Sequence, residues 1–344
     1  MAYTTINKST DYFNTKLYTG NNGTQSITGV GHQPDLIWVK ARNDTANNTL
    51  TDVIRGTNSV LYTNQNQAPD TPTNAITSFD SDGFSVGSNG SFNANSINYA
   101  SWNWKANGAG SANTDGSISS TVSANTTSRF SVVSYTGNGT AGATIGHGLG
   151  AVPKMIIVKQ YSSNGGTENW YVYHASLGNN KDLLLNLTND ASNTVTTWNN
   201  TTPTSSVFYL GSGDGVNNNT VSYIAYCFAD VTGYSKFGSY VGNGNADGPF
   251  IYTGFKPAFV LHKKSSASDD WNIFDNKRNP HNVVDKYLIP NSNGAEGTST
   301  NRDFLSNGFK IRSSSSYVNL SGATFIYMAF AEEPLVGDNP ATAR

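Results

Sequence analysis

Short apolar runs alternate with dense turn signals along the whole chain. No stretch of twelve or more residues keeps the 3.6-residue spacing of an amphipathic helix. The longest apolar runs have about five residues, whereas a membrane-spanning helix needs about 20. Three dipeptides typical of hairpin turns recur at corresponding places: Asp82-Gly83, Asp214-Gly215 and Asn307-Gly308. The pattern therefore predicts an all-β fold of short strands, without membrane insertion.

Three parts of the chain repeat the same landmarks in the same order. Each part begins with a Tyr-x-Gly-Asn motif, at 18–21, 135–138 and 240–243. An apolar run that opens with Pro and closes with Lys follows in each, at 34–40, 153–159 and 257–263. Pro is tolerated at the first residue of a strand, because the amide of that residue need not join the ladder.

Further landmarks extend the correspondence to the end of each part. Trp170 and Trp271 follow their Lys residues, and we assign Thr51 to that place in the first part. Each part closes with an aromatic strand, at 99–104, 223–228 and 326–330. Four tryptophans lie on predicted strands and are expected to belong to the core: Trp102, Trp104, Trp170 and Trp271.

The repeat length indicates domains rather than a solenoid. Successive Lys landmarks lie about 105 to 120 residues apart, well beyond the roughly 20–50 residues of solenoid and propeller repeats. A unit of this size can bury a core of its own. We therefore predict three tandem β-sandwich domains, jelly-roll or immunoglobulin-like, at 1–106, 128–232 and 233–336. Residues 107–127 are predicted to be a flexible Gly/Ser/Thr/Asn linker, and 337–344 a C-terminal tail.

Composition narrows the function classes. Only 13% of the 344 residues are charged and the formal net charge is −2, so clustered Lys and Arg for a nucleic-acid surface are not expected. The chain contains 44 Asn residues, which favour turns and give an amide-rich surface. The single cysteine, Cys227, lies in an apolar run and is expected to be a buried, inert thiol.

No motif predicts catalysis, a metal ion or a cofactor. The five His residues are scattered, whereas a metal site needs several ligands at fixed spacing. Asp80 and Asp82 precede Gly83 as in a calcium loop, but the other parts share only the turn. Glycoside hydrolysis needs two convergent carboxylates, and neighbours such as Glu332 and Glu333 on one strand point to opposite faces.

Ligand binding by loop aromatics and amides is the remaining possibility. Trp198 is followed by Asn199 in a polar loop and has no counterpart in the other two parts. The absence of a counterpart is expected for a residue that is specialised for binding a sugar. Tyr161 is a weaker candidate of the same kind. The alternative for Trp198 is packing at a seam between domains, and the sequence favours neither.

Several segments together resemble a known repeat family of unknown function that is common in proteins of tailed bacteriophages, especially marine ones. The segments that carry this resemblance are 34–42, 78–84, 99–106, 147–154, 330–334 and 340–344. The resemblance implies a virion structural protein, often a tail-fibre protein, and it implies no catalytic residues.

We therefore expect a non-enzymatic virion appendage at the particle surface. In this hypothesis the protein is tail-fibre-like or receptor-binding, contacts host surface polysaccharide, and assembles with itself and with tail or capsid proteins. A capsid-surface decoration or head-fibre protein is the alternative. A glycan-degrading enzyme is disfavoured because the acid pair is missing.

Overall fold

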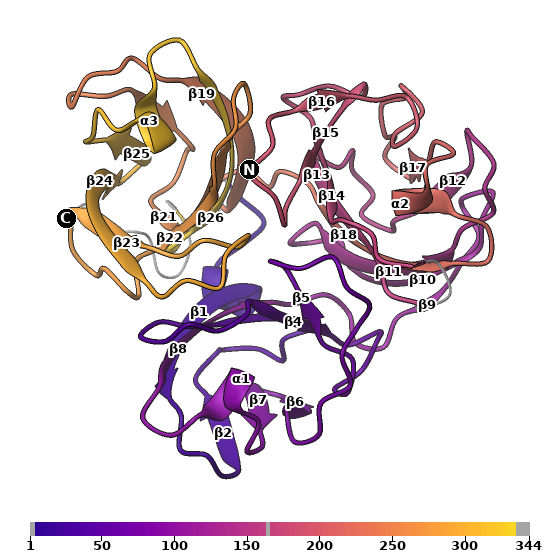
Figure 1. The fold of residues 1–344 in the computed structure, drawn as a ribbon, viewed down its shortest axis with the longest axis horizontal. Coiled ribbons are helices and arrows are strands. Elements are labelled where there is room, and N and C mark those ends of the chain that lie inside the picture. Colours follow the sequence, from indigo (N-terminus) through magenta and orange to yellow (C-terminus); the bar gives the residue numbers. More distant parts are fainter. Residues whose placement is uncertain (1–3, 163–165, 335–344) are drawn as a thin grey trace.

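The chain folds into three lobes around a common centre (Figure 1). The structure is a computed structural model that describes residues 4–162 and 166–334. We name the lobes by their residues: lobe 1 is 4–106, lobe 2 is 107–162 with 166–232, and lobe 3 is 233–334. The described residues form antiparallel sheets, and their helices are only a 3-10 turn and three short α-helices. The all-β prediction is confirmed, whereas the domain boundaries stay a prediction.

Lobe 1 contains two sheets with an apolar core between them. The larger sheet has the strand order β1 (Phe13–Thr19), β8 (Asn98–Trp104), β3 (Leu36–Ala41), β4 (Thr49–Asp52) and β5 (Leu61–Tyr62). The smaller sheet has the order β2 (Gln25–Thr28), β7 (Gly83–Val86) and β6 (Ile76–Asp80). The helices of this lobe are η1 (Ser9–Asp11) and α1 (Gly90–Asn93). Residues of both sheets, including Ile37 and Phe84, are buried in one cluster.

Lobe 2 has one large sheet and one two-stranded sheet. The large sheet has the order β16 (Ser192–Asn193), β15 (Lys181–Leu184), β14 (Tyr171–His174), β13 (Met155–Gln160), β18 (Ser222–Phe228), β11 (Phe130–Thr136), β10 (Ser120–Asn125) and β9 (Ser111–Asn113). The small sheet pairs β12 (Thr144–Gly146) with β17 (Val207–Tyr209), and α2 (Asp214–Asn217) follows.

Lobe 3 has two four-stranded sheets. One has the order β19 (Ser235–Val241), β26 (Thr324–Ala331), β21 (Pro257–Lys264) and β22 (Trp271–Asp275). The other has the order β20 (Phe250–Tyr252), β25 (Gly308–Ile311), β24 (Gly297–Leu305) and β23 (Val284–Tyr287), and α3 (Ser316–Asn319) precedes β26. The predicted tail, 337–344, lies outside the described residues.

The prediction of a flexible linker at 107–127 is wrong. Strands β9 and β10 lie within it, and β10 pairs with β11 from Ser120, opposite Tyr135, to Asn125, opposite Phe130. A ladder is made by the main chain, so Ser and Thr side chains do not prevent it. Val122 also buries its side chain in the lobe 2 core. The small polar composition therefore misled the interpretation of this segment.

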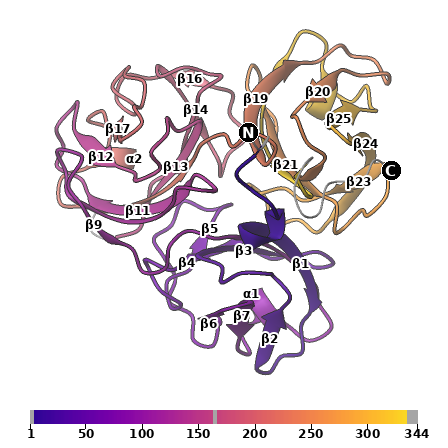
Figure 2. The same ribbon diagram turned by 180° about the vertical axis from the view of Figure 1, so that it is seen from behind.

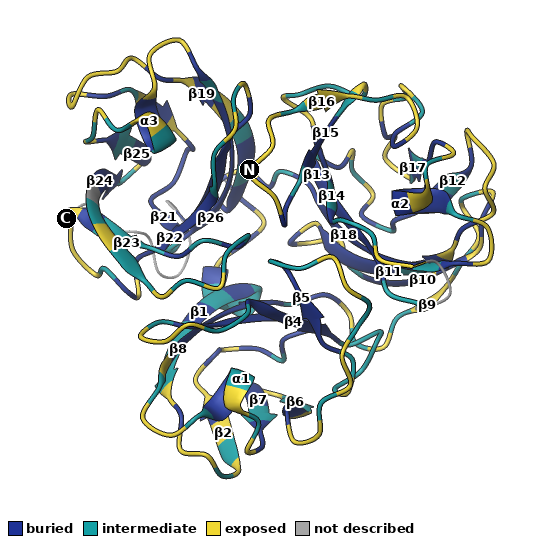
Figure 3. Cartoon of the chain, viewed as in Figure 1, coloured by how far each residue is buried: buried dark blue, intermediate teal, exposed yellow. Residues whose placement is uncertain are grey.

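In each lobe the sheet that contains β3, β13 or β21 faces the centre, and we call it the large sheet of that lobe. The central strands of this sheet are buried on both faces. In β3 all six residues are buried: Ile37 and Val39 pack inside lobe 1, whereas Leu36 and Trp38 pack into a core shared by the three lobes. Strands near the centre are accordingly buried throughout, and exposed residues lie on the outer loops (Figure 3). This explains the continuous apolar runs in the sequence.

Aromatic rings from all three lobes meet at the centre. Trp104, Phe228 and Phe330 lie near the ends of β8, β18 and β26, and their ring centroids are 5.9 to 6.3 Å apart. Phe13, Phe130, Phe237 and Phe259 pack around these three rings, and we call the whole group the central aromatic cluster. The three lobes also lie side by side in the view from behind (Figure 2). The cluster therefore joins the lobes in one hydrophobic core.

Three side-chain hydrogen bonds link the lobes in a ring, each from a donor in one lobe to a main-chain oxygen in the next. Trp170 Nε1 of lobe 2 donates to Tyr62 O of lobe 1 at 3.0 Å. Trp271 Nε1 of lobe 3 donates to Leu184 O of lobe 2 at 3.0 Å. The bond from lobe 1 to lobe 3 runs from Asn48 Nδ2 to the main-chain oxygen of Ile289, at 3.2 Å.

The strand register shows that Asn48 takes the place of the two tryptophans. Asn48 comes just before Thr49, which pairs with Val39, and Trp170 comes just before Tyr171, which pairs with Val158. The assignment of Thr51 to this place is therefore wrong. We call the contact between two neighbouring lobes a seam. The side-chain amide of Asn and the indole of Trp both carry the N–H donor that the seam needs, although the two residue types do not resemble each other in the sequence.

The three Lys landmarks make a second set of bonds with the same direction. Lys40 Nζ donates to Asn293 O at 3.2 Å, Lys159 Nζ to Asn66 O at 3.0 Å, and Lys263 Nζ to Thr188 O at 3.1 Å. All three lysines are buried. Burial lowers the pKa of each of them from 10.5 to about 8.

Two of the seams also hold a buried acid–arginine pair. Tyr226 of lobe 2 donates to Asp52 of lobe 1 at 2.8 Å, and Asp52 pairs with Arg55 at 2.6 Å. Trp102 of lobe 1 donates in the same way to Asp275 of lobe 3, which pairs with Arg278.

The third seam replaces that pair by uncharged groups. His174 and Leu177 stand where the other seams have Asp and Arg, three residues apart. His174 contacts Tyr327 O at 3.2 Å, and burial lowers its pKa to about 4, which keeps the ring neutral. Acid and arginine are thus exchanged together, which avoids an unpaired buried charge.

The Tyr-x-Gly-Asn landmark fixes the outer helix of each lobe. Tyr18, Tyr135 and Tyr240 each donate their hydroxyl to a main-chain oxygen of α1, α2 or α3, at 2.8 to 2.9 Å. In lobe 1 a Cβ on Gly20 would lie 2.1 Å from Ala94 O, so only glycine fits the approach.

The Trp170→Phe variant should be less stable than Trp38→Phe. Both changes shrink a buried indole, but Trp170 Nε1 has two carbonyl partners, whereas Trp38 Nε1 has none in the described part of the chain. Leaving the partners of Trp170 unsatisfied should cost about 1–3 kcal/mol more in the free energy of unfolding. Urea unfolding measures the difference, and equal losses in both variants would contradict the role of the seam bond.

The free energy of unfolding should rise between about pH 8 and 9.5. The folded pKa of the three lysines is about 8 and the unfolded value is 10.5, so in this window the unfolded chain binds more protons. Raising the pH therefore favours the folded state. Above about pH 10 buried tyrosines such as Tyr135, whose pKa burial raises, oppose this trend.

Urea unfolding at several pH values measures this slope. The Lys40→Met variant should show a smaller slope than the unaltered chain, because one of the three groups no longer titrates. A stability that does not change from pH 7.5 to 9.5 would show that the lysines keep their ordinary pKa in the fold.

Candidate functional site

Trp198 is buried in the core of lobe 2. Only 2% of its surface is exposed, and its ring packs against Tyr173 with centroids 5.8 Å apart. Thr197 donates to Asp182 at 2.7 Å, and the main chain at 196–197 accepts from 211 and 213, so the loop is held over the sheet. The burial of the ring gives no support to the prediction that Trp198 contacts a ligand. The ring also does not pack at a domain seam, since it lies in the core cluster of lobe 2.

The other two predicted ligand residues serve the fold in separate places. Asn199 has a left-handed backbone with φ of 52° and its amide bonds locally to Thr201, as expected in a turn. Tyr161 packs against the shared core, and its hydroxyl lies 2.9 Å from Ser134 Oγ. The structure does not bring Tyr161 to Trp198, so the three residues do not form a site.

The described residues show no group of three or more His, Cys, Asp or Glu side chains that could hold a metal ion. Cys227 is buried, and burial raises the pKa of its thiol, so it stays protonated as expected. No helix in the described part of the chain is long and apolar enough to cross a membrane.

Lobe 2 has a small polar pocket of about 210 Å³ near α2. Two carboxylate residues, Glu168 and Asp214, line it together with Tyr171. Tyr171 donates its hydroxyl to Glu168 at 3.2 Å, so this carboxylate already has a partner. A Cβ on Gly215 would lie 2.0 Å from the Tyr171 ring, which shows how closely the helix packs there.

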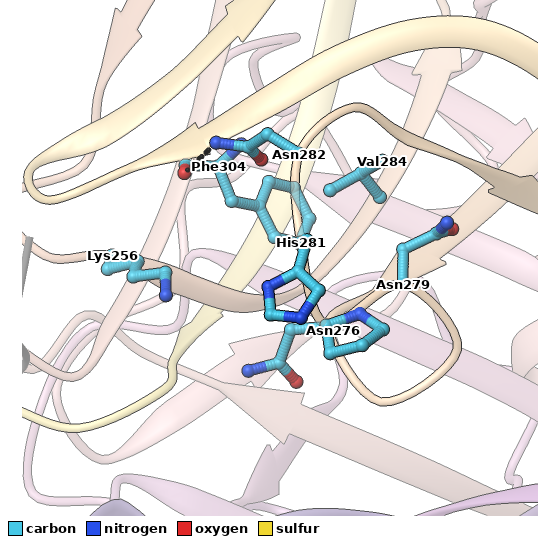
Figure 4. Close-up of a pocket in the computed structure, with 8 residues that line it drawn as sticks. Lys256, Asn276, Asn279, His281, Asn282, Val284 and Phe304 are labelled. Carbon is cyan, nitrogen blue, oxygen red and sulfur yellow. Dashed lines mark hydrogen bonds between the residues drawn. The ribbon is translucent and has the colours of Figure 1, made fainter. Parts of the chain in front are cut away.

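A second pocket, of about 240 Å³, lies in lobe 3 at the end of the sandwich. It is smaller than the roughly 300–1,000 Å³ of a drug-sized ligand site, so it suits one small ring. Phe304 and Val284 contribute buried apolar surface. The polar groups come from three places in the chain (Figure 4): Lys256, Asn276, and the loop Asn279, His281 and Asn282. We call this the lobe 3 pocket.

Most polar groups of the lobe 3 pocket are already paired. Lys256 forms an ion pair with Glu332 at 2.5 Å. Asn279 donates to Asp285 and accepts from the Lys286 main chain, each at 2.8 Å. Asn282 bonds twice to the main chain of Phe304. These bonds hold the loop that forms the rim.

Asn276 is different, because its side-chain oxygen has no partner. The residue is 8% exposed, and Oδ1 is buried without a hydrogen bond among the described residues. Figure 4 shows the amide below the His281 ring. A buried carbonyl without a donor costs about 1–3 kcal/mol. Other buried side-chain atoms of the described residues, such as Trp198 Nε1, also lack a partner, so it is the place of this oxygen beside the pocket that favours a ligand with an O–H or N–H group.

The other lobes show that the fold does not need this amide. The main-chain N–H of Asn276 donates to Ala258 O, as Val53 does to Asp35 O and Ala175 to Lys154 O, always to the residue after the first Pro of the run. Asn276 therefore corresponds to Val53 and Ala175. By the same alignment Lys256, before the Pro, corresponds to Gln33 and Val152.

Sequence analysis missed the lobe 3 pocket. A comparison of the three copies would have indicated it. Only lobe 3 has Lys just before the strand β21, at 256, and Asn just after the strand β22, at 276. Nothing in the local sequence indicates that Lys256 and Asn276, twenty residues apart, lie at one mouth with Phe304.

The Trp198→Ala variant should lose about 3–5 kcal/mol of stability, because it empties a large buried site. Thermal unfolding measures the loss, and Val195→Ala, at a residue that is 60% exposed in the same loop region, is the control. A variant as stable as the control would show that the indole is not part of the core.

Comparison with known proteins gives one match. Residues 8–334 match a family described as "Domain of unknown function (DUF7483)". No curated protein and no solved structure matches the chain. The match extends over all three lobes, so the chain belongs to the DUF7483 family.

Proposed function

We propose that this protein is a non-enzymatic virion surface protein, tail-fibre-like or receptor-binding, that contacts host surface glycans through the lobe 3 pocket. The observation that carries the proposal is the unpartnered oxygen of Asn276 beside the buried Phe304. The virion setting comes from the sequence resemblance to proteins of tailed bacteriophages.

The chemistry of the lobe 3 pocket fits a sugar. A sugar ring has an apolar C–H face, which can pack on an aromatic ring, and hydroxyl groups at its edge. Phe304, which is only 2% exposed, contributes a small part of the apolar wall. Asn276 offers the acceptor, and Lys256 is a donor that is 8% exposed and already paired with Glu332. Few placed polar groups over an apolar surface are typical of small-molecule sites.

The architecture of the molecule favours binding of a ligand at a fixed surface rather than catalysis. The three lobes share one core and are joined by hydrogen bonds at their seams, so the surface loops are carried by a single packed body. The small net charge of −2 limits attraction to unrelated charged partners.

The Asn276→Ala variant should bind glycans at least tenfold more weakly than the unaltered chain. Alanine stands at the corresponding position of lobe 2, so the fold should tolerate it. An array of neutral and acidic bacterial oligosaccharides finds the ligand, and titration calorimetry gives the Kd. Ala175→Gly, at that corresponding position, is the matched control. The proposal is wrong if no glycan binds, or if Asn276→Ala binds its ligand as well as the unaltered chain.

Location on the particle tests the virion setting separately. A specific antibody seen by electron microscopy at the tail supports an attachment protein. A label that follows capsid symmetry would favour a decoration protein, and no label on purified particles would contradict the setting.

A further inference from the structure

Two aromatic side chains stand out on the surface of lobe 3. Phe250 is 44% exposed and Tyr252 is 61% exposed. Among the exposed large apolar residues in the described ranges, they alone are aromatic. Both lie on β20, the edge strand of the sheet β20–β25–β24–β23, which faces away from the other lobes (Figure 2).

The other lobes have small residues at these places. Ile251 of β20 pairs with Phe309, as Ile27 of β2 pairs with Phe84. Phe250 and Tyr252 therefore correspond to Ser26 and Thr28 in lobe 1. In lobe 2 the corresponding residues are Thr144 and Gly146, on either side of Ile145, which pairs with Phe208. The fold does not require rings there.

The two rings form one platform. Alternate residues of a strand lie on the same face, roughly 7 Å apart, so Phe250 and Tyr252 share the outer face. Tyr252 pairs with Gly308, which has no side chain, and a Cβ there would lie 3.0 Å from the Phe250 ring. The missing side chain leaves room for Phe250 to lie over the neighbouring strand.

This platform lies next to the lobe 3 pocket. Gly308 pairs with Tyr252 on one side and with Leu305 on the other. Leu305 follows Phe304, which lines the pocket. Two strand spacings, roughly 10 Å, separate Tyr252 from Leu305, and both residues lie on the outer face of the sheet. Phe304 lies on the inner face, so a sugar chain that uses both places passes round the end of the hairpin at 305–308.

The charges beside the platform are paired within the chain. Lys310, opposite Phe250, lies 2.8 Å from Asp247, and Arg312 lies 2.6 Å from Asp303. The surface is therefore aromatic and polar but balanced in charge. This matches a neutral, hydroxyl-rich chain better than a nucleic acid or an acidic polymer, which need unpaired cations.

We propose that Phe250 and Tyr252 form a second sugar subsite, which makes the ligand of lobe 3 a neutral polysaccharide chain rather than a single sugar. This inference rests on the proposed glycan binding at the lobe 3 pocket. Aromatic rings that stack on successive units add affinity with each unit they cover. Single sugars therefore bind at the pocket alone, and longer oligomers use both places.

The double variant Phe250→Ser with Tyr252→Thr tests the subsite. It installs the residues that lobe 1 carries on β2, so the edge strand should fold. The probes are glucose and N-acetylglucosamine oligomers of one to six units, measured by titration calorimetry. The unaltered chain should bind the hexamer of one series at least tenfold more tightly than its monomer. The double variant should lose that gain and keep the affinity for the monomer.

The Asn276→Ala variant keeps the two proposals apart. It should weaken the binding of every oligomer, including the monomer. If affinity does not grow with length in the unaltered chain, or grows equally in the double variant, the second subsite is wrong while the pocket stands. If no oligomer of either series binds, both the subsite and these sugars as its ligand are wrong. A platform used for self-association would instead make the unaltered chain dimeric and the double variant monomeric in sedimentation, which also overturns the subsite.

Discussion

The structure depends on the burial of the second face of each large sheet. One face of β3, β13 and β21 packs inside its own lobe, but the other carries large apolar side chains, such as Trp38 and Phe259, that only the neighbouring lobes cover. A lobe by itself would expose this face to water, at a cost that rises with every Å² of apolar surface. The central aromatic cluster is therefore the reason why three lobes form one body, and why the sequence has continuous apolar runs.

The hydrogen bonds at the seams fix how the three lobes are arranged relative to one another. Side chains at equivalent positions donate a hydrogen bond from each lobe to the next and so close the ring. Main-chain bonds such as the one from Ala191 N–H to Ser265 O run in the other direction across the same seams. Within this plan the chemistry varies. Asn48 replaces an indole, and His174 with Leu177 replaces an acid–arginine pair. A buried charge without its partner costs several kcal/mol, so only the joint replacement keeps the seam stable.

The sequence pattern was sufficient for the strands but not for the way they meet. Pro-to-Lys runs and Tyr-x-Gly-Asn motifs mark elements that each lobe needs for itself, and they recur because the local geometry recurs. Seam partners lie far apart in the sequence, for example 241 residues for Asn48 and Ile289. Their donors share a function rather than a residue type, which hid the role of Asn48. Composition also misled at β10, where main-chain pairing outweighs the small polar side chains, and at Trp198, where a polar loop covers a buried ring.

The internal correspondence separates what the fold needs from what it does not. Glycines and hydroxyl donors that recur in every lobe have partners within the lobe and are explained by them. Lys256, Asn276, Phe250 and Tyr252 occur in lobe 3 alone, at positions where the other lobes carry different residues. Three of the four cost stability where they stand: one leaves a buried oxygen unpaired, and two expose aromatic rings to water. Residues that burden a fold without serving it are expected where a ligand makes up the cost. Phe250 and Tyr252 lie on β20 of one sheet of lobe 3, and Lys256 and Asn276 flank β21 and β22 of the other. That all four distinguish the same lobe is the reason to test them as one binding surface.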